Sequence, residues 1–439
     1  MDPDHHAAKP EGFNLVLPLP YRVAVILVAG RKLPHAFDAL TENLYEANGF
    51  NSSHRCLGMG FKSALFIRSK DSGSVPVYKS TYHLATLLSI PLAFSLLLFW
   101  AITHRSPELV LAWEVLPQSY LFIFSILLFL PLHRLSRAGR HRLLVTLKRV
   151  GFGGLAEAQD GKFGDIIFAD VLTSYAKVLG DLFVTQCMFF SSGVSSTGVP
   201  NRACGGNFAI PLLISIPSII RLRQCLIEYS RVQRRGNRNV DGWGGQHLAN
   251  ALKYSTAFPV IILTALQQGY DPSRVGLSEA GLHKLWVLSA LIQSSFTFYW
   301  DVAKDWDLCL FSDITTQFRH NPYHHVSSAS ALSQTHEFEP GLDRPFGLRR
   351  HRFFHADGIY YGAIAIDFIL RFTWMSRLSV RLNWIHDLES GVFALMFLEV
   401  ARRWMWIFLR VETEWVRSTR GPSPDDILLG EFTPKIDED

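Results

Sequence analysis

The sequence predicts an all-α, polytopic membrane protein, a helical bundle of about nine or ten transmembrane helices. Charged residues make up 18% of the 439 residues, below the roughly 25% that is usual for soluble proteins. The apolar residues are gathered into segments of about 20 residues, which is the length needed to cross a lipid core. The net charge is only +5, and the basic residues stand in short runs beside the apolar segments. This pattern is typical of contact with membrane lipid and not of nucleic-acid binding.

The first part of the chain, residues 1–160, is expected to hold the amino-terminal membrane helices and a polar loop over residues 31–82. Its apolar spans are predicted at 13–30, 84–102 and 110–133. The last of these is expected to break at Pro117, because proline interrupts helices. The basic segment that follows, up to Val150, is either an amphipathic helix at the membrane surface or a short span, and the pattern does not choose between them.

Residues 161–417 are expected to form a second, more regular transmembrane domain, followed by a disordered cytosolic tail over residues 418–439. Its helices are predicted at 166–190, 207–226, 248–268, 285–305, 358–380 and 390–411. Arginine and lysine concentrate in the loops 134–149, 221–238 and 344–352, but not in 191–206 and 268–283. The positive-inside rule therefore places the basic loops and the carboxyl terminus in the cytosol.

Charged residues interrupt these apolar helices, where a lipid-facing charge costs at least about 2.5–3.5 kcal/mol. They are Asp170, Arg221, Lys253, Asp301, Asp305, Asp367, Arg371, Glu399, Arg402 and Arg403. We expect them to face a partner, a cavity or a substrate. The predicted topology places the first five at one depth near the cytosolic surface, and the three arginines of the last two helices deeper in the membrane.

Two groups of polar residues are spaced to share a helix face. Asp170 is followed by Thr173, Ser174 and Lys177 at i+3, i+4 and i+7. This face either lines a functional path or packs against other helices through hydrogen bonds. The acids at 301 and 305 stand four residues apart; they either meet a cation, protons or basic groups, or mark a helix end that faces water.

The last two helices combine acids with arginines. Asp367 and Arg371 are spaced for an ion pair within one helix, and Glu399 repeats the pattern with Arg402 and Arg403. Two acids cannot neutralise three arginines, so a positive charge remains. Because the planar guanidinium suits phosphate or carboxylate, we expect an anion site; a structural charge network is the alternative.

The sequence does not indicate a metal site, a cofactor or an enzyme. The five cysteines show no CxxC or zinc-like spacing, so neither a disulfide framework nor a metal site is predicted. His320, His324 and His325 stand on a long polar loop and are expected to be solvated. The nucleotide-binding, hydrolase and metalloprotease signatures GxxxxGK[ST], GxSxG and HExxH do not occur.

From about Asp165 to Arg417 the chain resembles the EXS domain of eukaryotic phosphate exporters. The matching segments are FADVLTSYAKVLGDL, IPSIIRLRQCLIEY, NALKYST, FTFYWDVAKDWDL, IDFILRFTW and LEVARRWMWIFLRVETE. With no SPX domain before the first helix, the chain is most similar to the fungal Golgi members of this family, which are needed for the retention of lumenal ER proteins.

The resemblance implies export of inorganic phosphate, here its return from the Golgi lumen to the cytosol, in support of glycosylation and of the retention of lumenal ER and Golgi proteins. It places the chain in the Golgi membrane, with the ER and other early secretory membranes as alternatives. The phosphate path that it implies is lined by Asp170, Thr173, Arg221, Lys253, Tyr254, Asp301, Asp305, Arg371, Trp374, Arg402 and Arg403. Thr173 and Ala176 stand where animal exporters have asparagine and serine.

A sorting or scaffold protein is the competing interpretation. Such a protein would bind Golgi glycosyltransferases or coat proteins through its cytosolic loops and tail. Neutralising Arg402 and Arg403 would then leave the retention of Golgi enzymes intact, whereas deleting residues 411–439 would abolish it. Whether the chain forms a homodimer stays open at this point.

Overall fold

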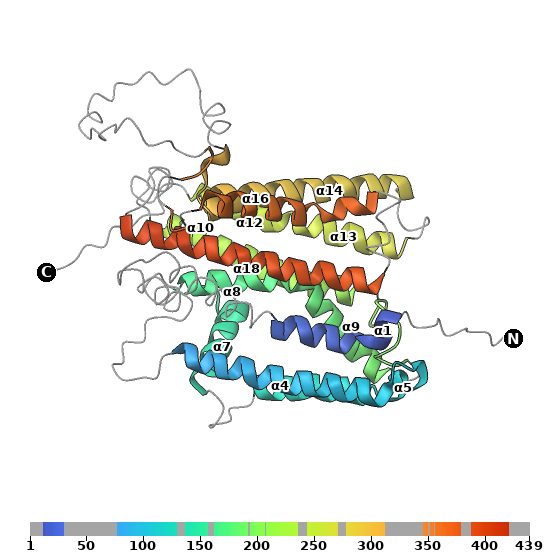
Figure 1. Ribbon diagram of the computed structural model, residues 1–439. Helices are drawn as coiled ribbons and strands as arrows, with labels where there is room; N and C mark the ends of the chain where they lie inside the picture. Colours follow the sequence, from blue (N-terminus) through green and yellow to red (C-terminus); the bar gives the residue numbers. More distant parts are fainter. Residues whose placement is uncertain are drawn as a thin grey trace, which may run out of the picture.

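The protein is an all-α helical bundle, as the sequence predicts (Figure 1). The computed structural model describes residues 12–29, 77–129, 137–156, 162–191, 194–206, 208–235, 244–270, 278–311, 346–349, 352–354, 356–378 and 388–420. No strand occurs in these ranges. The three histidines of the long polar loop and residues 421–439 lie outside them.

The elements follow one another along the chain with short breaks. They are α1 (Gly12–Val16), an unlabelled helix (Leu19–Ala29), α4 (Val77–Thr103), α5 (Pro107–Ala112), α6 (Val115–Phe129), α7 (Arg137–Lys148), a π-turn (Arg149–Gly153), α8 (Lys162–Ser174), α9 (Ala176–Phe190), α10 (Ala209–Arg235), α12 (Gly245–Ser255), α13 (Ala257–Gln268), α14 (Glu279–Trp300), a second π-turn (Asp301–Asp305), two 3-10 helices (Cys309–Phe311 and Thr373–Leu378), α16 (Asp357–Arg371) and α18 (Glu389–Arg420).

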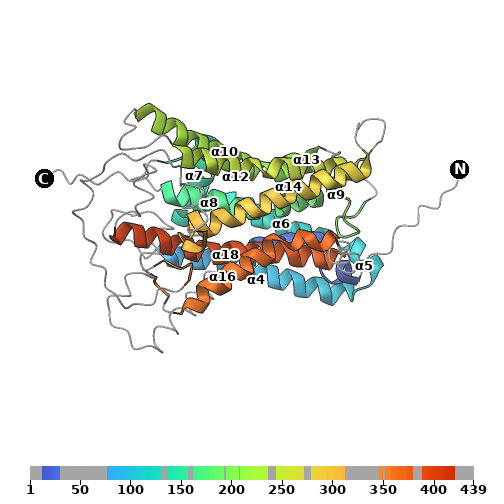
Figure 2. The same ribbon diagram turned by 90° about the horizontal axis from the view of Figure 1, so that it is seen from above.

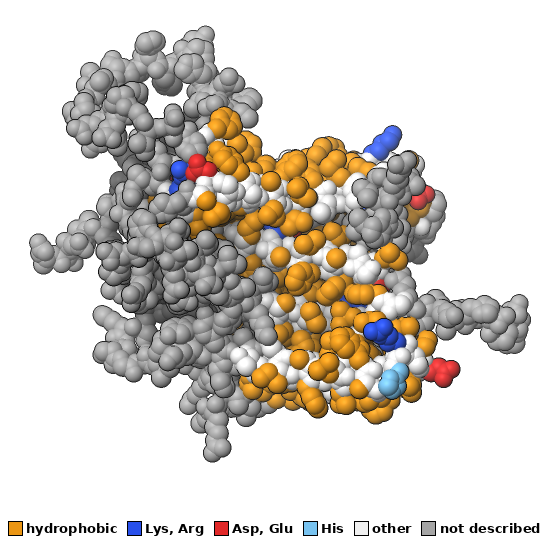
Figure 3. Space-filling view, in the orientation of Figure 1, with side chains coloured by type: hydrophobic (Ala, Val, Ile, Leu, Met, Phe, Trp, Pro, Cys, Tyr) orange, Lys and Arg blue, Asp and Glu red, His pale blue; other side chains and the backbone are white. Residues whose placement is uncertain are grey.

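Most of the long helices run side by side (Figures 1 and 2). Four helices of the described part are long and apolar enough to cross a membrane: Thr86–Thr103, Pro107–Leu127, Ala209–Arg234 and Gly245–Gln268. Large apolar side chains such as Phe94 and Phe122, each 67% exposed, cover the outside (Figure 3). Such a surface requires lipid, because water-soluble proteins rarely expose contiguous apolar patches. The number of nine or ten spans stays a prediction.

Helix α18 joins the two largest of the hydrophobic cores in the described part of the bundle. One core joins the helix Leu19–Ala29 and α4 to α6 with α9 and with Met396 and Val400 of α18. The other joins α8, the second π-turn and α16 with Trp406 and Ile407 of the same helix. Residues of α18 therefore contact both the amino-terminal helices and the carboxyl-terminal half of the chain.

The span predicted at 110–133 breaks earlier than expected. The chain leaves the helix at Trp113 and Glu114, and Pro117 lies inside the first turn of α6, where proline is tolerated because the first amides of a helix have no intrahelical acceptor. The Glu114 carboxylate instead accepts hydrogen bonds from the Ser195 hydroxyl (2.8 Å) and the Ser196 amide (2.7 Å). This expectation was wrong because the break follows a tertiary contact.

Several helices predicted to be continuous are broken within the bundle. The chain departs from the α-helix at Tyr175, at Thr256 and at Phe372, and α14 passes into its π-turn after Trp300. The break at Thr256 has a clear cause. Pro259 has no amide to donate to the carbonyl four residues earlier, and the Thr256 hydroxyl donates to the Lys253 carbonyl at 2.6 Å, which bends helices.

A disulfide joins Cys187, near the end of α9, to Cys204 in the loop before α10. The cysteine spacing gave no indication of this bridge, because the two residues meet only through the fold. The bridge lies at the end of the bundle where α18 begins (right in Figure 1), which we call the disulfide end. The opposite end, where α18 finishes, we call the tail end.

We predict that the Cys187–Cys204 bridge stabilises the folded protein. Replacing both cysteines with serine should lower the free energy of unfolding by about 3 kcal/mol, the usual value for a loop of this size. Thermal unfolding in detergent, followed by tryptophan fluorescence, measures the change, with Cys309→Ser as the control that leaves the bridge intact. Alkylation of both cysteines in the unreduced protein would contradict the bridge.

Candidate functional site: a buried charge network

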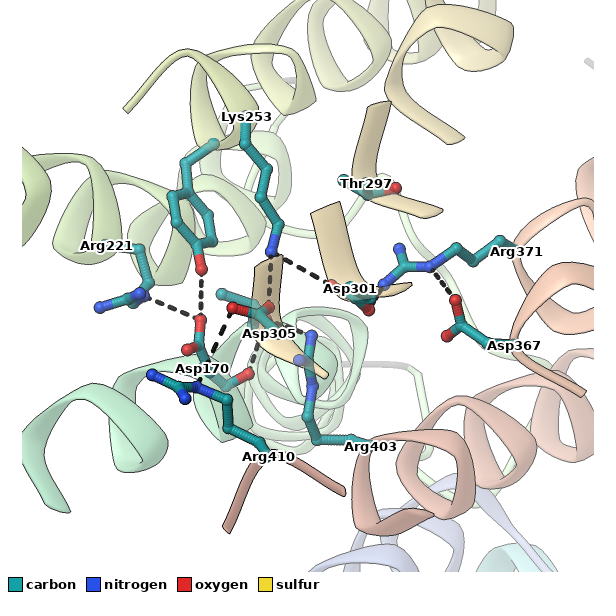
Figure 4. A network of polar contacts seen from close by, with 12 residues as sticks. Asp170, Arg221, Lys253, Thr297, Asp301, Asp305, Asp367, Arg371, Arg403 and Arg410 are labelled. Carbon is teal, nitrogen blue, oxygen red and sulfur yellow. Dashed lines mark hydrogen bonds and ion pairs between the residues drawn. The ribbon is translucent and has the colours of Figure 1, made fainter. Parts of the chain in front are cut away.

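The network is centred on Asp301, a wholly buried carboxylate at the point where α14 becomes a π-turn (Figure 4). Its oxygens lie 3.2 Å from the Lys253 ammonium and 3.6 Å from the Arg402 guanidinium, and they also accept a hydrogen bond from Arg371. These cations come from α12, α18 and α16. One acid thus draws together four separate helices.

Asp367 forms a second bridge between α16 and α18. One of its oxygens accepts from Arg371 Nε at 2.9 Å, and the other accepts from Arg402 Nη1 at 2.8 Å. The predicted ion pair of Asp367 with Arg371 within one helix is therefore confirmed. Glu399 binds Arg402 through both oxygens, at 2.7 and 2.9 Å.

The half of the network nearer the tail end is built around Asp170. Its carboxylate lies 2.8 Å from Arg221 Nε and accepts a hydrogen bond of 2.5 Å from the Tyr254 hydroxyl. The Arg221 guanidinium also stacks on the Tyr254 ring, 4.8 Å from its centre. Three helices, α8, α10 and α12, supply these side chains.

Asp305 completes this half of the network. It lies 3.4 Å from Lys253 Nζ and 4.0 Å from Arg410 Nε. Since Lys253 also meets Asp301, both acids contact a basic group, which is one of the alternatives that the sequence left open. The alternative, a water-facing helix end, is wrong for Asp301, because its carboxylate has no exposed surface.

Arg403 differs from the other arginines because its hydrogen-bond partners are neutral. Its Nε donates to the Ser174 hydroxyl at 2.9 Å and its Nη2 to the Thr173 hydroxyl at 3.2 Å, and the guanidinium lies 4.7 Å from the centre of the Trp406 ring. The side chain is buried. Within the described ranges, no carboxylate forms an ion pair with it.

The expected pairing of Glu399 with both neighbouring arginines is correct only for Arg402. Both oxygens of Glu399 are occupied by Arg402, and one of them also accepts from Ser174 at 2.8 Å. Arg403 consequently points past Glu399 toward α8. This leaves a buried guanidinium that forms no ion pair with any acid of the described residues, although Glu399 and Asp301 lie near enough to attract it.

Acidic and basic side chains of the network are equal in number. The acids are Asp170, Asp301, Asp305, Asp367, Glu399 and Glu414, the last of which lies 3.4 Å from Arg410; the bases are Arg221, Lys253, Arg371, Arg402, Arg403 and Arg410. Arg403 is the base with which none of these acids forms an ion pair, and burying a charge without a partner is expensive. Its guanidinium therefore favours a bound anion.

Trp374 lies beside the network and not in it. Its indole nitrogen donates to the Ser294 hydroxyl at 2.9 Å, and that hydroxyl donates to the Arg371 carbonyl at 3.2 Å. The ring packs edge-on against Trp286 at 5.9 Å. Trp374 thus fixes the end of α16 from which Arg371 projects.

Arg410 and a second cluster of charged residues in the bundle were not predicted from the sequence. Arg410 stands seven residues after Arg403, so helical spacing alone could have indicated it. A second cluster at the disulfide end joins Arg22 to Glu389 at 2.7 Å and Arg202 to both Glu389 (2.7 Å) and Asp181 (3.6 Å). Arg22, a charged residue within the first apolar segment, was the one indication of this cluster in the sequence. Glu389, with which it pairs, and Arg202 are too far away in the sequence to be identified from spacing.

The described residues contain no group of three or more histidine, cysteine or acidic side chains arranged to hold a metal ion. The acids of the network are instead held by arginine, lysine and tyrosine. The chemistry that this arrangement supports is recognition of an anion by guanidinium, ammonium and hydroxyl donors.

Comparison with known proteins agrees with this architecture. Residues 51–416 match the EXS family, so the match also includes α4 to α7. The chain is 30% identical over 336 residues to Protein ERD1 homolog 2 of Schizosaccharomyces pombe, covering 76% of each protein. It is 26% identical over 431 residues to Protein ERD1 of Kluyveromyces lactis, covering 95% of this chain and 98% of that protein. It is 27% identical over 271 residues to human Solute carrier family 53 member 1, covering 57% and 32%.

We predict that Asp301→Asn destabilises the protein by about 3–5 kcal/mol, because removing one partner leaves buried cations uncompensated. Thermal unfolding in detergent measures the loss. Glu108→Gln, at an exposed site in the first turn of α5, is the control and should change stability by less than about 0.5 kcal/mol. Adding Lys253→Met to Asp301→Asn should recover part of the stability. Equal stability of Asp301→Asn and the control would refute the central role of Asp301.

Proposed function

The chain belongs to the EXS family, and from that premise we propose that it transports inorganic phosphate from the Golgi lumen to the cytosol. Through this transport it supports glycosylation and the retention of lumenal ER and Golgi proteins. The proposal concerns the substrate, the membrane and the direction. That the chain is a multi-pass membrane protein of this family follows from its helices and from the family match.

The observation that carries the proposal is the hydrogen bonding of Arg403, whose partners in the described part of the chain are hydroxyl groups. A guanidinium held deep in a bundle by two hydroxyl groups, with no carboxylate bonded to it, has free donor capacity for an oxyanion. The neighbouring hydroxyls of Thr173 and Ser174 can turn to donate to the same anion. Arg403 therefore provides the primary holding site.

The remaining cations extend this site along the bundle. Arg371 and Arg402 share Asp301 and Asp367, so an arriving anion can compete with these acids for their donors. Nearer the tail end, Lys253 and Arg221 are also paired with acids. In this arrangement the acids prevent the cations from binding the anion too tightly, which is a condition for release and onward passage.

The acids also favour phosphate over other tetrahedral oxyanions. Near neutral pH phosphate retains at least one P–OH group, which can donate a hydrogen bond to a carboxylate such as Asp301 or Asp305. Sulfate has no proton to donate and would face those carboxylates unpaired. Because an unsatisfied buried polar group is costly, the network discriminates against sulfate.

Two observations support the orientation. Arginine and lysine concentrate in the segments 134–149 and 221–238, which were expected to be loops but largely form α7 and the last turns of α10. Both segments adjoin the tail end, and this favours a cytosolic tail end. The Cys187–Cys204 bridge lies at the other end, and disulfides persist in oxidising compartments such as the secretory lumen. Both place the disulfide end in the lumen.

We predict that purified protein in liposomes moves radiolabelled phosphate and that Arg403→Met lowers this flux by about 10- to 100-fold. The estimate corresponds to the loss of a charged hydrogen-bond donor, about 1.5–3 kcal/mol. A tenfold excess of sulfate should inhibit wild-type flux far less than unlabelled phosphate does. Arg234→Met, at an exposed site near the end of α10, is the matched control and should retain wild-type flux.

Phosphate flux of the wild type no greater than that of empty liposomes would refute the transport proposal. Normal flux in Arg403→Met, with the control also normal, would refute the assigned role of Arg403 alone. Each variant is compared at equal reconstituted protein, measured by quantitative immunoblotting of the vesicles.

The same substitution separates transport from a scaffold function in cells. If retention depends on phosphate transport, Arg403→Met should cause loss of Golgi enzymes and lumenal ER proteins to the medium, whereas a chain ending after residue 420 should retain them. The opposite pattern would favour a sorting or scaffold protein. Secretion of a lumenal ER protein, measured by immunoblotting of the medium, is the readout.

A further inference from the structure

Lys177, the second residue of α9, lies between the two charge clusters of the bundle and is part of neither. Toward the tail end, Ser174 belongs to the central network through its bonds with Glu399 and Arg403. Toward the disulfide end, Asp181 belongs to the cluster of Arg202 and Glu389. Lys177 stands four residues before Asp181, so these two side chains project from nearly the same face of α9. Ser174 is the last residue of α8, directly before the break at Tyr175.

The ammonium of Lys177 forms no hydrogen bond and no ion pair with any side chain in the described part of the chain. The charged groups that act on it are Arg377, Glu399, Asp181 and Arg202. Both acids already have partners, because Glu399 is bound by Arg402 and Asp181 lies 3.6 Å from Arg202. A second cation, Arg377 of the 3-10 helix after α16, adds to the positive field at this point.

The space around Lys177 is open. Its side chain is exposed although the neighbouring Val178 is buried. Glu399, which reaches across to Ser174 from α18, keeps 37% of its side-chain surface exposed. Side chains therefore do not fill the gap between α9 and α18 at this depth, and a small hydrated solute has room beside the ammonium.

We propose that Lys177 forms a second oxyanion-binding subsite, on the lumenal side of the central network. It binds inorganic phosphate arriving from the lumen before the anion reaches Arg403. This inference rests on the proposed transport of phosphate and adds a binding residue to it. The Arg202–Glu389 cluster lies beyond Lys177 toward the lumen. The subsite therefore lies between this cluster and the central network, in each of which most charged side chains already pair with one another.

An ammonium suits this position better than a guanidinium. Lysine is a compact point charge on a flexible stem, whereas arginine holds an anion in a fixed fork. A flexible single charge can capture a hydrated anion. It can then release the anion to the guanidinium of Arg403, whose N–H donors have a fixed geometry. The two residues thus divide capture and holding between them.

Equilibrium binding of radiolabelled phosphate to purified protein in detergent tests the subsite. Compared with wild type, Lys177→Met should weaken binding by roughly tenfold, the effect of one charge-assisted hydrogen bond, and Lys177→Arg should restore most of the affinity. Lys284→Met, at an exposed lysine near the start of α14, is the matched control and should bind as wild type does.

A second measurement needs no variant. Phosphate should slow acetylation of Lys177 by an amine-reactive ester, quantified by mass spectrometry, and should leave acetylation of Lys284 unchanged when chloride of equal ionic strength is the reference. Equal protection of both lysines, or none at Lys177, would overturn the subsite.

The outcomes separate this inference from the proposed function. If the wild type neither binds nor transports phosphate, the proposed function fails and the subsite fails with it. If the wild type binds phosphate and Lys177→Met binds it with unchanged affinity, only the subsite is refuted. If Lys177→Met does not fold, the acetylation measurement decides.

Discussion

The burial of the Asp301 carboxylate is the constraint on which the bundle depends. This acid has no exposed surface and meets cations from α12, α16 and α18. In lipid, separating those helices would leave several charges without partners, and the hydrocarbon can neither solvate these charges nor form hydrogen bonds with them. The same constraint keeps Lys253, Arg371 and Arg402 at fixed positions. One set of contacts thus assembles the carboxyl-terminal helices and holds the basic side chains that we propose as anion donors.

The helix breaks support the same arrangement. Tyr175 follows Ser174, Thr256 follows Tyr254 within two residues, and Phe372 follows Arg371 directly. In a bilayer, irregular backbone is tolerated only where protein or a water-filled cavity surrounds it, and transporters use such interruptions to build sites near mid-depth. Each break frees the preceding side chain from the regular spacing of its helix.

Apolar length and the cost of buried charge were sufficient to predict the fold class, the approximate positions of most helices and most members of the network, but not the breaks within the helices. Charges such as Asp367 and Arg371 stand in otherwise apolar helices and can be paired from their spacing alone. Pairings across helices could not be predicted in this way. Arg403 bonds with hydroxyls of α8 because the two helices cross there, and Cys187 reaches Cys204 because a loop folds back. Both depend on tertiary geometry that no local pattern records.

The bridge between Cys187 and Cys204 also has a consequence for biogenesis. It ties the loop that carries Arg202 to α9, and it can close only after that loop has entered an oxidising compartment. A chain inserted the wrong way round would keep both thiols reduced and the loop untethered. Correct membrane insertion and covalent closure of the loop are therefore linked steps in the maturation of this protein.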